Sequence, residues 1–420
     1  MRMKQFRALW VIVAAFVCFG CGPSRLSSDA SAIDAVLSAA VASGKVPGVA
    51  AAAASHDRVL YQSAFGKTEL DSGAPLPADA IFQIASMTKA VTSVAVMQLV
   101  EAGKVALDDP AHVHLPELKD VQVLDGFDSG GKPILRPPSH APTVRELLAH
   151  TAGYGYSFWN ENIRTFESGN ELPTGRERYL KTPLAFDPGS RWGYGPNTDV
   201  LGILVEAVSG LTLEQYFRER IFDPLKMPDT RFQATAADWP RVPARYQRTA
   251  DGGLGAAALP RPEAPPRVTF FSGGGGLTST VPDYIRFLRA LLNGGELDGA
   301  RILSRESIEL MAQNQIGELE AGTIRTLTPN LLSDVDFFPN SKDKFGLGFL
   351  INADAVQGGR SAGSMAWAGL FNTYFWVDRE NDICGVLMTQ ILPFGEPVVL
   401  ALLEEYERAV YATFKRGGRE

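Results

Sequence analysis

The spacing of apolar residues predicts a sheet built from the two ends of the chain. Apolar residues recur at helical spacing in 31–43 and 397–415. Apolar runs of strand length lie at 49–54, 59–65, 346–351, 372–377 and 383–390. Short polar turns separate neighbouring runs, and such turns favour antiparallel pairing. We therefore expect one sheet domain formed by residues 30–67 and 272–417.

The middle of the chain, residues 68–271, has mainly helical patterns. Residues 90–102 are apolar on nearly every face, which is typical of a buried helix. Further helices are expected at 144–149, 200–209, 213–221 and 282–292. The Pro- and Gly-rich stretches 120–142 and 234–276 connect such segments, and loops this long usually shape or cover a site. The pattern predicts an α/β (α+β) chain.

Residues 1–21 have the pattern of a secretory signal peptide. Three basic residues in the first seven precede an apolar run, 9–19, that is too short to span a membrane. The run ends at Cys18 and Cys21, in a stretch that resembles a bacterial lipobox with Cys18 where leucine is usual. We expect export to the periplasm, or to the outer membrane as a lipoprotein if Cys21 is lipidated. Lipidation and plain cleavage are equally supported.

Composition narrows the choice of partners. The 420-residue chain has a net charge of -7 and no run of Lys or Arg, so nucleic-acid binding is not expected. Its 3 Cys do not indicate a disulfide framework. His112 and His114 form a lone pair that no Cys or acidic cluster completes, so no metal or cofactor is expected. The sequence gives no signal for the oligomeric state.

The strongest chemical motif is Ser86-Met87-Thr88-Lys89, which opens the apolar helix. Residues three apart share a helix face, so the Lys89 amine can reach the Ser86 hydroxyl. The positive end of the helix dipole favours the alkoxide of an attacking serine. The motif alone also fits a serine N-cap followed by a solvated lysine. The apolar helix weakens that alternative, because few solvated lysines lie in such a segment.

Two later stretches add groups that such a serine would need. Tyr194 lies on a Gly- and Pro-rich loop before a helix, from which its phenol can project into a cleft. The stretch 367–370 precedes a predicted strand, and Gly369 would let a substrate approach the backbone. The N–H groups of Leu370 and Ser86 could then hold an oxyanion. Taken alone, each stretch also fits an aromatic residue that packs in the core.

In this order, the motifs resemble the serine β-lactamase and penicillin-recognising superfamily, and within it the class-C-like carboxylesterases of family VIII. The resemblance rests on residues 82–89, 143–153, 188–194, 222–230, 273–280 and 367–369. It implies an antiparallel five-stranded sheet flanked by helices, an all-helical domain, and a site between them at the helix that starts with Ser86. It also implies that Ser86 is acylated, that Lys89 activates it, and that Tyr194 is the general base.

Two departures from the family pattern favour neutral esters over charged β-lactams. Lactamases of this type have Asn two residues after the tyrosine, where this chain has Pro196, and Asn197 follows one position later. Trp367 replaces a cationic lysine, offering an apolar face and one N–H in place of a point charge. We expect Trp367, Gly369 and Asn197 to contact the substrate.

Three alternatives stay open. A β-lactamase or D-alanyl-D-alanine carboxypeptidase would use the same acyl-enzyme. A non-catalytic penicillin-binding-like sensor would be signalled by loss of Lys89 or Tyr194, and both are present. Finally, Ser361 lies in a Gly-x-Ser-x-Gly pattern, but that pattern requires a following helix and a downstream histidine. All 5 His precede Ser361, and a strand is expected after it.

Overall fold

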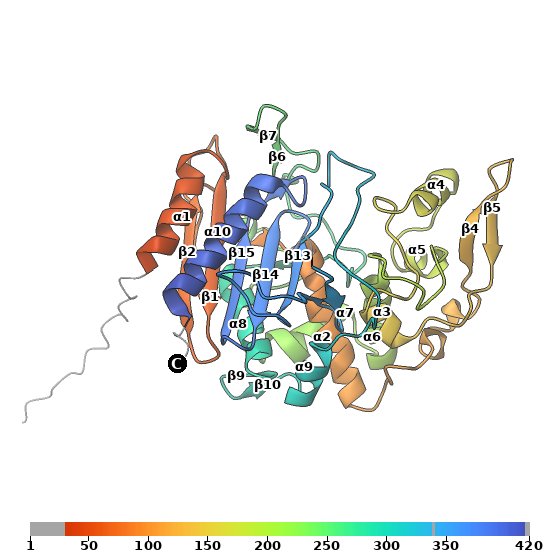
Figure 1. The fold of residues 1–420 in the computed structure, drawn as a ribbon. Coiled ribbons are helices and arrows are strands. Elements are labelled where there is room, and N and C mark those ends of the chain that lie inside the picture. The colour runs from red at the N-terminus through yellow and green to blue at the C-terminus, as the bar shows by residue number, and fades with distance from the viewer. Residues whose placement is uncertain (1–29, 338–340, 416–420) are drawn as a thin grey trace, which may run out of the picture.

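A computed structural model describes residues 30–337 and 341–415. The predicted signal peptide and Cys21 lie outside these residues. The main feature is a seven-stranded antiparallel sheet in the order β11-β12-β13-β14-β15-β1-β2 (Figure 1). Its strands are β11 (Lys344–Phe345), β12 (Leu350–Ile351), β13 (Met365–Gly369), β14 (Thr373–Asp378), β15 (Ile383–Met388), β1 (Gly48–Ala54) and β2 (Val59–Gly66). All seven come from the two ends of the chain.

The sheet has two strands more than the five predicted, namely β11 at one edge and β13 between β12 and β14. The sequence predicts a single strand over 346–351, whereas only β12 is extended there. Gly348 has φ +95°, and the Gly346 N–H donates to the Phe349 carbonyl at 2.8 Å, so the chain turns between β11 and β12. A second difference concerns Trp367, which lies within β13 instead of preceding a strand.

Helices cover both faces of the sheet. On one face, α1 (Ser31–Ala42) and α10 (Pro397–Phe414) lie side by side, as Figure 1 shows. Their apolar residues form a core with alternate residues of β1 and β15. On the other face, α8 (Val281–Leu292) packs against β1, β14 and β15. The period-two alternation of these strands explains how one sheet supports two separate cores.

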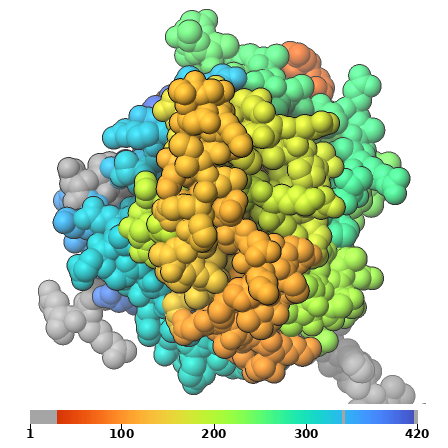
Figure 2. All heavy atoms as spheres, turned by 90° about the vertical axis from the view of Figure 1, so that its right-hand side faces the viewer, coloured from red at the N-terminus to blue at the C-terminus, as the bar shows by residue number. Residues whose placement is uncertain are grey.

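The remaining elements form the mainly helical part beside the sheet. Its helices are α2 (Thr88–Glu101), α3 (Val144–Leu148), α4 (Glu161–Gly169), α5 (Arg176–Lys181), α6 (Asn197–Ser209), α7 (Leu213–Phe217) and α9 (Arg305–Met311). The predicted loops contain the hairpins β4–β5 (Val123–Phe127, Pro133–Arg136) and β6–β7 (Tyr246–Arg248, Leu254–Ala256). Figure 2 shows that the chain around residues 100–190, in orange to yellow-green, covers the face away from the sheet. In the described residues, no single helix is long and apolar enough to cross a membrane, although the bent pair Asn197–Ser209 and Leu213–Phe222 passes jointly on length and composition.

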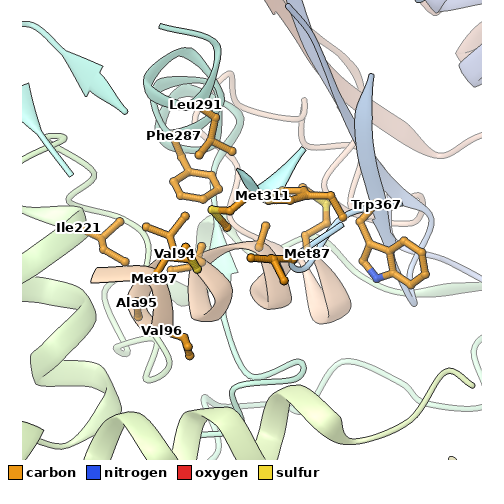
Figure 3. Packing of buried hydrophobic residues seen from close by; sticks show 14 of the residues in the cluster. Met87, Val94, Ala95, Val96, Met97, Ile221, Phe287, Leu291, Met311 and Trp367 are labelled. Atoms are coloured by element: carbon orange, nitrogen blue, oxygen red, sulfur yellow. The ribbon is translucent and has the colours of Figure 1, made fainter. Parts of the chain in front are cut away.

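Helix α2 lies at the centre of the larger core. Of its 14 residues, 11 are buried, which confirms a helix without a solvent face. Figure 3 shows Val94 and Met97 on the side of Phe287 and Leu291 of α8. Each such side chain contributes about 1.5–3 kcal/mol through burial. This packing fixes the helix that carries Lys89 into the interior.

Candidate active site

Ser86 lies in a short 3₁₀ turn (Ala85–Met87) directly before α2. The preceding residue, Ala85, has φ +41°, a backbone region that residues with a Cβ seldom occupy. Such strain is typical of functional sites. Ser86 is half-buried and lines a cavity of about 240 Å³. Its hydroxyl is therefore accessible to a small molecule.

Lys89 is 1% exposed, and its amine has three hydrogen-bond acceptors. The Nζ atom lies 3.3 Å from Ser86 Oγ, 3.3 Å from the Tyr156 hydroxyl and 2.7 Å from the Gly274 carbonyl oxygen. A lysine ammonium has three N–H donors, so this set of acceptors matches it fully. The i, i+3 spacing thus places the amine beside Ser86.

Tyr194 lines the same cavity but contacts Lys89 through its ring. The Lys89 Nζ lies 4.8 Å from the centre of that ring. Among the described residues, the hydrogen-bond partner of the Tyr194 hydroxyl is Trp367, whose Nε1–H donates to it at 3.4 Å. The structure therefore brings hydroxyl, amine and phenol to one cavity, with the phenol oxygen turned toward Trp367.

Tyr156 is a site residue that the sequence analysis missed. Its backbone N–H donates to the Tyr194 carbonyl at 3.3 Å, so the two tyrosine loops are joined. Burial, followed by the negative charge of Asp199, raises the pKa of Tyr156 well above its usual value. The hydroxyl therefore keeps its proton, which it donates to Asp199 at 3.5 Å. The Tyr156 hydroxyl is hydrogen-bonded to the amine, yet it is unsuited to act as a base because it keeps its proton.

Asp199 is a second missed residue. It is 2% exposed and accepts hydrogen bonds from Ser272 Oγ at 2.5 Å and from the Gly274 N–H at 3.1 Å. Burial raises the pKa of its carboxyl group, whereas the Lys89 charge opposes that rise. A Cβ on Gly274 would lie 2.2 Å from the carboxylate, so any other residue there would force the carboxylate or the loop to move. An acidic residue beside the apolar start of α6, together with the glycine run 273–276, was the available sequence signal.

The predicted oxyanion groups lie on one wall of the cavity. Strand β13 runs against the turn that carries Ser86, and a Cβ on Gly369 would lie 2.1 Å from the Ile84 carbonyl oxygen. Gly369 and Leu370 both line the cavity with Ser86. Trp367 lines it too, with its ring centre 5.0 Å from that of Tyr194. Close packing of glycine thus brings the end of β13 beside the serine.

Asn197 does not line the cavity, in contrast to the prediction. It is fully buried, and its side-chain amide donates to Nδ1 of His150 at 2.8 Å. Pro196 stands two residues after Tyr194, and the amide of Asn197, one residue later, is directed at His150. Burial, and then the charge of Lys89, lower the pKa of His150 well below its usual value. The centre of the neutral ring lies 5.1 Å from the centre of the Tyr194 ring, so the two rings pack together.

The cavity walls are apolar and aromatic. Besides the residues above, they include Phe158, Trp159, Tyr179, Ile324, Leu332, Phe337 and Phe394. Asp199 is the one charged residue among the described residues that line it. In the described ranges, no group of three or more His, Cys, Asp or Glu is arranged to hold a metal ion. The site therefore combines acid–base and nucleophilic groups with a mainly apolar cavity wall.

The rival serine, Ser361, lies outside this cavity. Its hydroxyl accepts a hydrogen bond from the Asn381 amide, and strand β13 follows it where a nucleophile elbow would need a helix.

Comparison with known proteins agrees with this arrangement. A family model described as Beta-lactamase matches residues 33–406. A lovastatin esterase from Penicillium rubens is 32% identical over 397 residues, covering 91% of this chain and 98% of the relative. A monacolin J acid methylbutanoyltransferase from Aspergillus terreus is 31% identical, covering 90% of this chain and 94% of the relative. The solved structure of unliganded simvastatin synthase (LovD) from Aspergillus terreus has a TM-score of 0.78 at 28% identity, with 93% and 100% coverage.

These matches extend over nearly the whole described chain, including every segment that contributes to the cavity. They include proteins named as an esterase and as acyl-transferring enzymes. The chain is an enzyme of the serine hydrolase and acyltransferase group and belongs to the β-lactamase family.

Proposed function

We propose that this enzyme cleaves carboxylic esters through an acyl-enzyme on Ser86. The observation that carries the proposal is the buried Lys89 amine 3.3 Å from a half-exposed serine hydroxyl on the wall of an apolar cavity. An isolated serine is a weak nucleophile, and a neighbouring group that takes its proton activates it. Tyr194 is the candidate for that group, since Tyr156 keeps its hydroxyl proton and donates it in a hydrogen bond to Asp199.

The proposed reaction has two balanced steps. The Ser86 oxygen attacks the ester carbonyl carbon while Tyr194, reacting as its phenolate, takes the hydroxyl proton, and the N–H groups of Ser86 and Leu370 stabilise the oxyanion. The bond to the alcohol then breaks, and the alcohol leaves with the proton from Tyr194. Water attacks the acyl-enzyme with its proton passing to Tyr194, and the acid is released as Ser86 recovers its hydrogen.

The character of the cavity supports neutral substrates. The described lining residues include no Lys or Arg that would pair with a substrate carboxylate. Trp367 lines the cavity at the position where lactamases have a lysine, and its N–H already donates to the Tyr194 hydroxyl. Cleavage of a β-lactam or of a D-alanyl-D-alanine peptide, whose carboxylates need such a partner, is therefore the less favoured use of this site.

A panel of substrates tests the proposal. Purified wild type and Ser86→Ala are compared on p-nitrophenyl butyrate, on an ester of similar size that carries a carboxylate, and on a chromogenic cephalosporin. We expect turnover of the neutral ester to exceed the other two and to fall by at least about a thousandfold in Ser86→Ala. Equal turnover of the neutral ester by the variant would refute the assignment.

Acyl transfer to an alcohol is a second candidate. The walls of the cavity carry aromatic side chains suited to a large apolar acceptor, and the Aspergillus relative is named a methylbutanoyltransferase. Such an acceptor would replace water in the second step. Adding an apolar alcohol to the ester assay should then give a new ester with an equal loss of free acid. If the acid yield does not change and no new ester is found, the enzyme is a hydrolase only.

We also propose export, on the pattern of residues 1–21 alone. The reported relatives include fungal proteins, which give no independent support for a bacterial export signal. Expression in a bacterial host, followed by fractionation and intact mass measurement, tests it. Cleavage before Cys21 with an added lipid mass is the result expected for a lipoprotein, and Cys21→Ser should abolish that mass. An uncleaved chain in the cytosolic fraction contradicts export.

A further inference from the structure

The Lys89 amine has more hydrogen-bond partners than the proposed reaction requires. Apart from Ser86, its acceptors are the Tyr156 hydroxyl and the Gly274 carbonyl oxygen. Both residues also bond to Asp199, since the Tyr156 hydroxyl donates to Oδ2 at 3.5 Å and the Gly274 N–H donates to Oδ1 at 3.1 Å. Two short routes therefore connect one buried carboxylate to one buried amine.

Among the residues that the structure describes, Asp199 is the acid near this amine. The other titratable groups that face Lys89 are Tyr156, Tyr194 and His150, and Tyr179 is close enough to Asp199 for the carboxylate charge to raise its pKa. Burial lowers the pKa of His150, so its ring is neutral. A buried ammonium without an opposite charge costs several kcal/mol. Asp199 is the group that supplies this charge.

A purely structural role for Asp199 fits the contacts less well. Asp199 lies in the first turn of α6, where an acidic side chain can bond free N–H groups of its own helix. Its hydrogen bonds within the described residues go instead to Ser272, Gly274 and Tyr156, all from other segments. Gly274 also approaches the carboxylate so closely that a Cβ would lie 2.2 Å from it. The loops are thus packed around the carboxylate on the Lys89 side.

We propose that Asp199, acting through Tyr156 and Gly274, is a positioning residue that keeps Lys89 in its ammonium form and directed at Ser86. This inference rests on the proposed function of the site. In this form, Lys89 lies against the Tyr194 ring, where its positive charge favours the phenolate that then accepts the serine proton. Loss of the carboxylate leaves the geometry of Ser86 intact but removes the charge that retains the third proton of the amine.

The first test measures the Lys89 ammonium group directly and does not depend on catalytic activity. Protein labelled with ¹⁵N on lysine side chains is titrated by NMR, with the Lys89 signal assigned from Lys89→Arg. In wild type, we expect a protected ammonium signal at neutral pH. In Asp199→Asn, a variant of equal size, the signal should disappear at a lower pH than in wild type, because the opposite charge is lost. Tyr156→Phe removes one route and keeps the charge, so we expect a smaller displacement, and this variant also serves if Asp199→Asn fails to fold.

The second test measures kcat and kcat/KM as functions of pH. For Asp199→Asn, we expect the alkaline limb of the kcat/KM profile to move to lower pH and kcat to fall by about tenfold or more, with KM changed less. Asp283→Asn is the matched control, because Asp283 is also buried and hydrogen-bonded but contacts Thr230 and Asp229. Its profile should follow wild type. In Tyr156→Phe combined with Asp199→Asn, the losses should be less than additive, because one route is shared.

The two tests separate this inference from the function on which it rests. If wild type has no ester turnover while the Lys89 signal shifts in Asp199→Asn, the proposed function fails and the positioning role stands. If wild type is active and both the Lys89 signal and the pH profile of Asp199→Asn match wild type, the positioning role is wrong.

Discussion

The amine of Lys89 lies 3.3 Å from the hydroxyl of Tyr156. Tyr194, the tyrosine that the family pattern marks, meets the same amine through its ring face and holds its hydroxyl toward Trp367. The two tyrosines differ in their partners. Burial and the neighbouring Asp199 carboxylate raise the pKa of Tyr156, which therefore keeps its proton, so Tyr194 is the tyrosine that we propose for proton transfer.

Tyr194→Phe should therefore lower kcat by about a hundredfold or more, because a positioned general base contributes about 10²- to 10⁴-fold. Steady-state hydrolysis of p-nitrophenyl butyrate measures the loss. Tyr216→Phe is the control, since Tyr216 is also buried but points its hydroxyl at Ala95 O away from the cavity. Equal activity of both variants would remove Tyr194 from the mechanism.

Trp367→Phe should have a smaller effect. The change keeps an aromatic ring against Tyr194 and Phe345 but removes the N–H that donates to the Tyr194 hydroxyl. A neutral hydrogen bond contributes about 0.5–1.5 kcal/mol, so we expect kcat/KM to fall about 2- to 10-fold. Trp239→Phe, which loses an N–H bond to the Pro262 carbonyl, should leave kcat/KM unchanged. A thousandfold loss in Trp367→Phe would mean that the ring itself touches the reacting atoms.

Gly274→Ala should impair both folding and catalysis. The new methyl group would lie 2.2 Å from the Asp199 carboxylate, so either the carboxylate or the loop must move. We expect destabilisation of about 1–3 kcal/mol by urea unfolding and a loss of ester turnover. Gly169→Ala is the control, because nothing lies within 4 Å of a Cβ there. Wild-type stability and turnover in Gly274→Ala would show that Asp199 is not fixed by this contact.

Asp283 gives a prediction about stability and pH. Burial raises its pKa to about 6, above a usual value near 3.8. The folded state therefore binds the proton more tightly than the unfolded state, and this contribution to stability is complete below the unfolded value and is lost as pH rises through about 6. We expect the stability of wild type relative to Asp283→Asn to fall by about 2 kcal/mol between pH 4 and pH 7, measured by urea unfolding. A difference that does not change with pH would contradict the raised pKa.

Local patterns were sufficient to predict most of the sheet and the buried helix. The near absence of polar faces in 90–102 predicts a core helix, and α2 is one. The pattern fails at 346–351, because Gly346 and Gly348 form a turn that apolarity alone does not reveal. The spacing of Ser86 and Lys89 is set within one helix turn, so their contact follows from sequence.

Contacts between distant segments could not be predicted in the same way. Tyr156 reaches Lys89 from a segment 67 residues along the chain, and Asp199, in helix α6, bonds to Tyr156 in turn, so no local spacing encodes these contacts. Asn197 was predicted to contact the substrate but does not line the cavity. With Pro196 two residues after Tyr194 and Asn197 one residue later, the Asn197 amide is directed at His150.

Intact-protein mass spectrometry after rapid quenching with an activated ester tests the central claim most directly. We predict that wild type gains the mass of one acyl group, that peptide mapping places it on Ser86, and that Ser86→Ala gains none. An acyl group on another residue, or equal labelling of Ser86→Ala, would contradict the account.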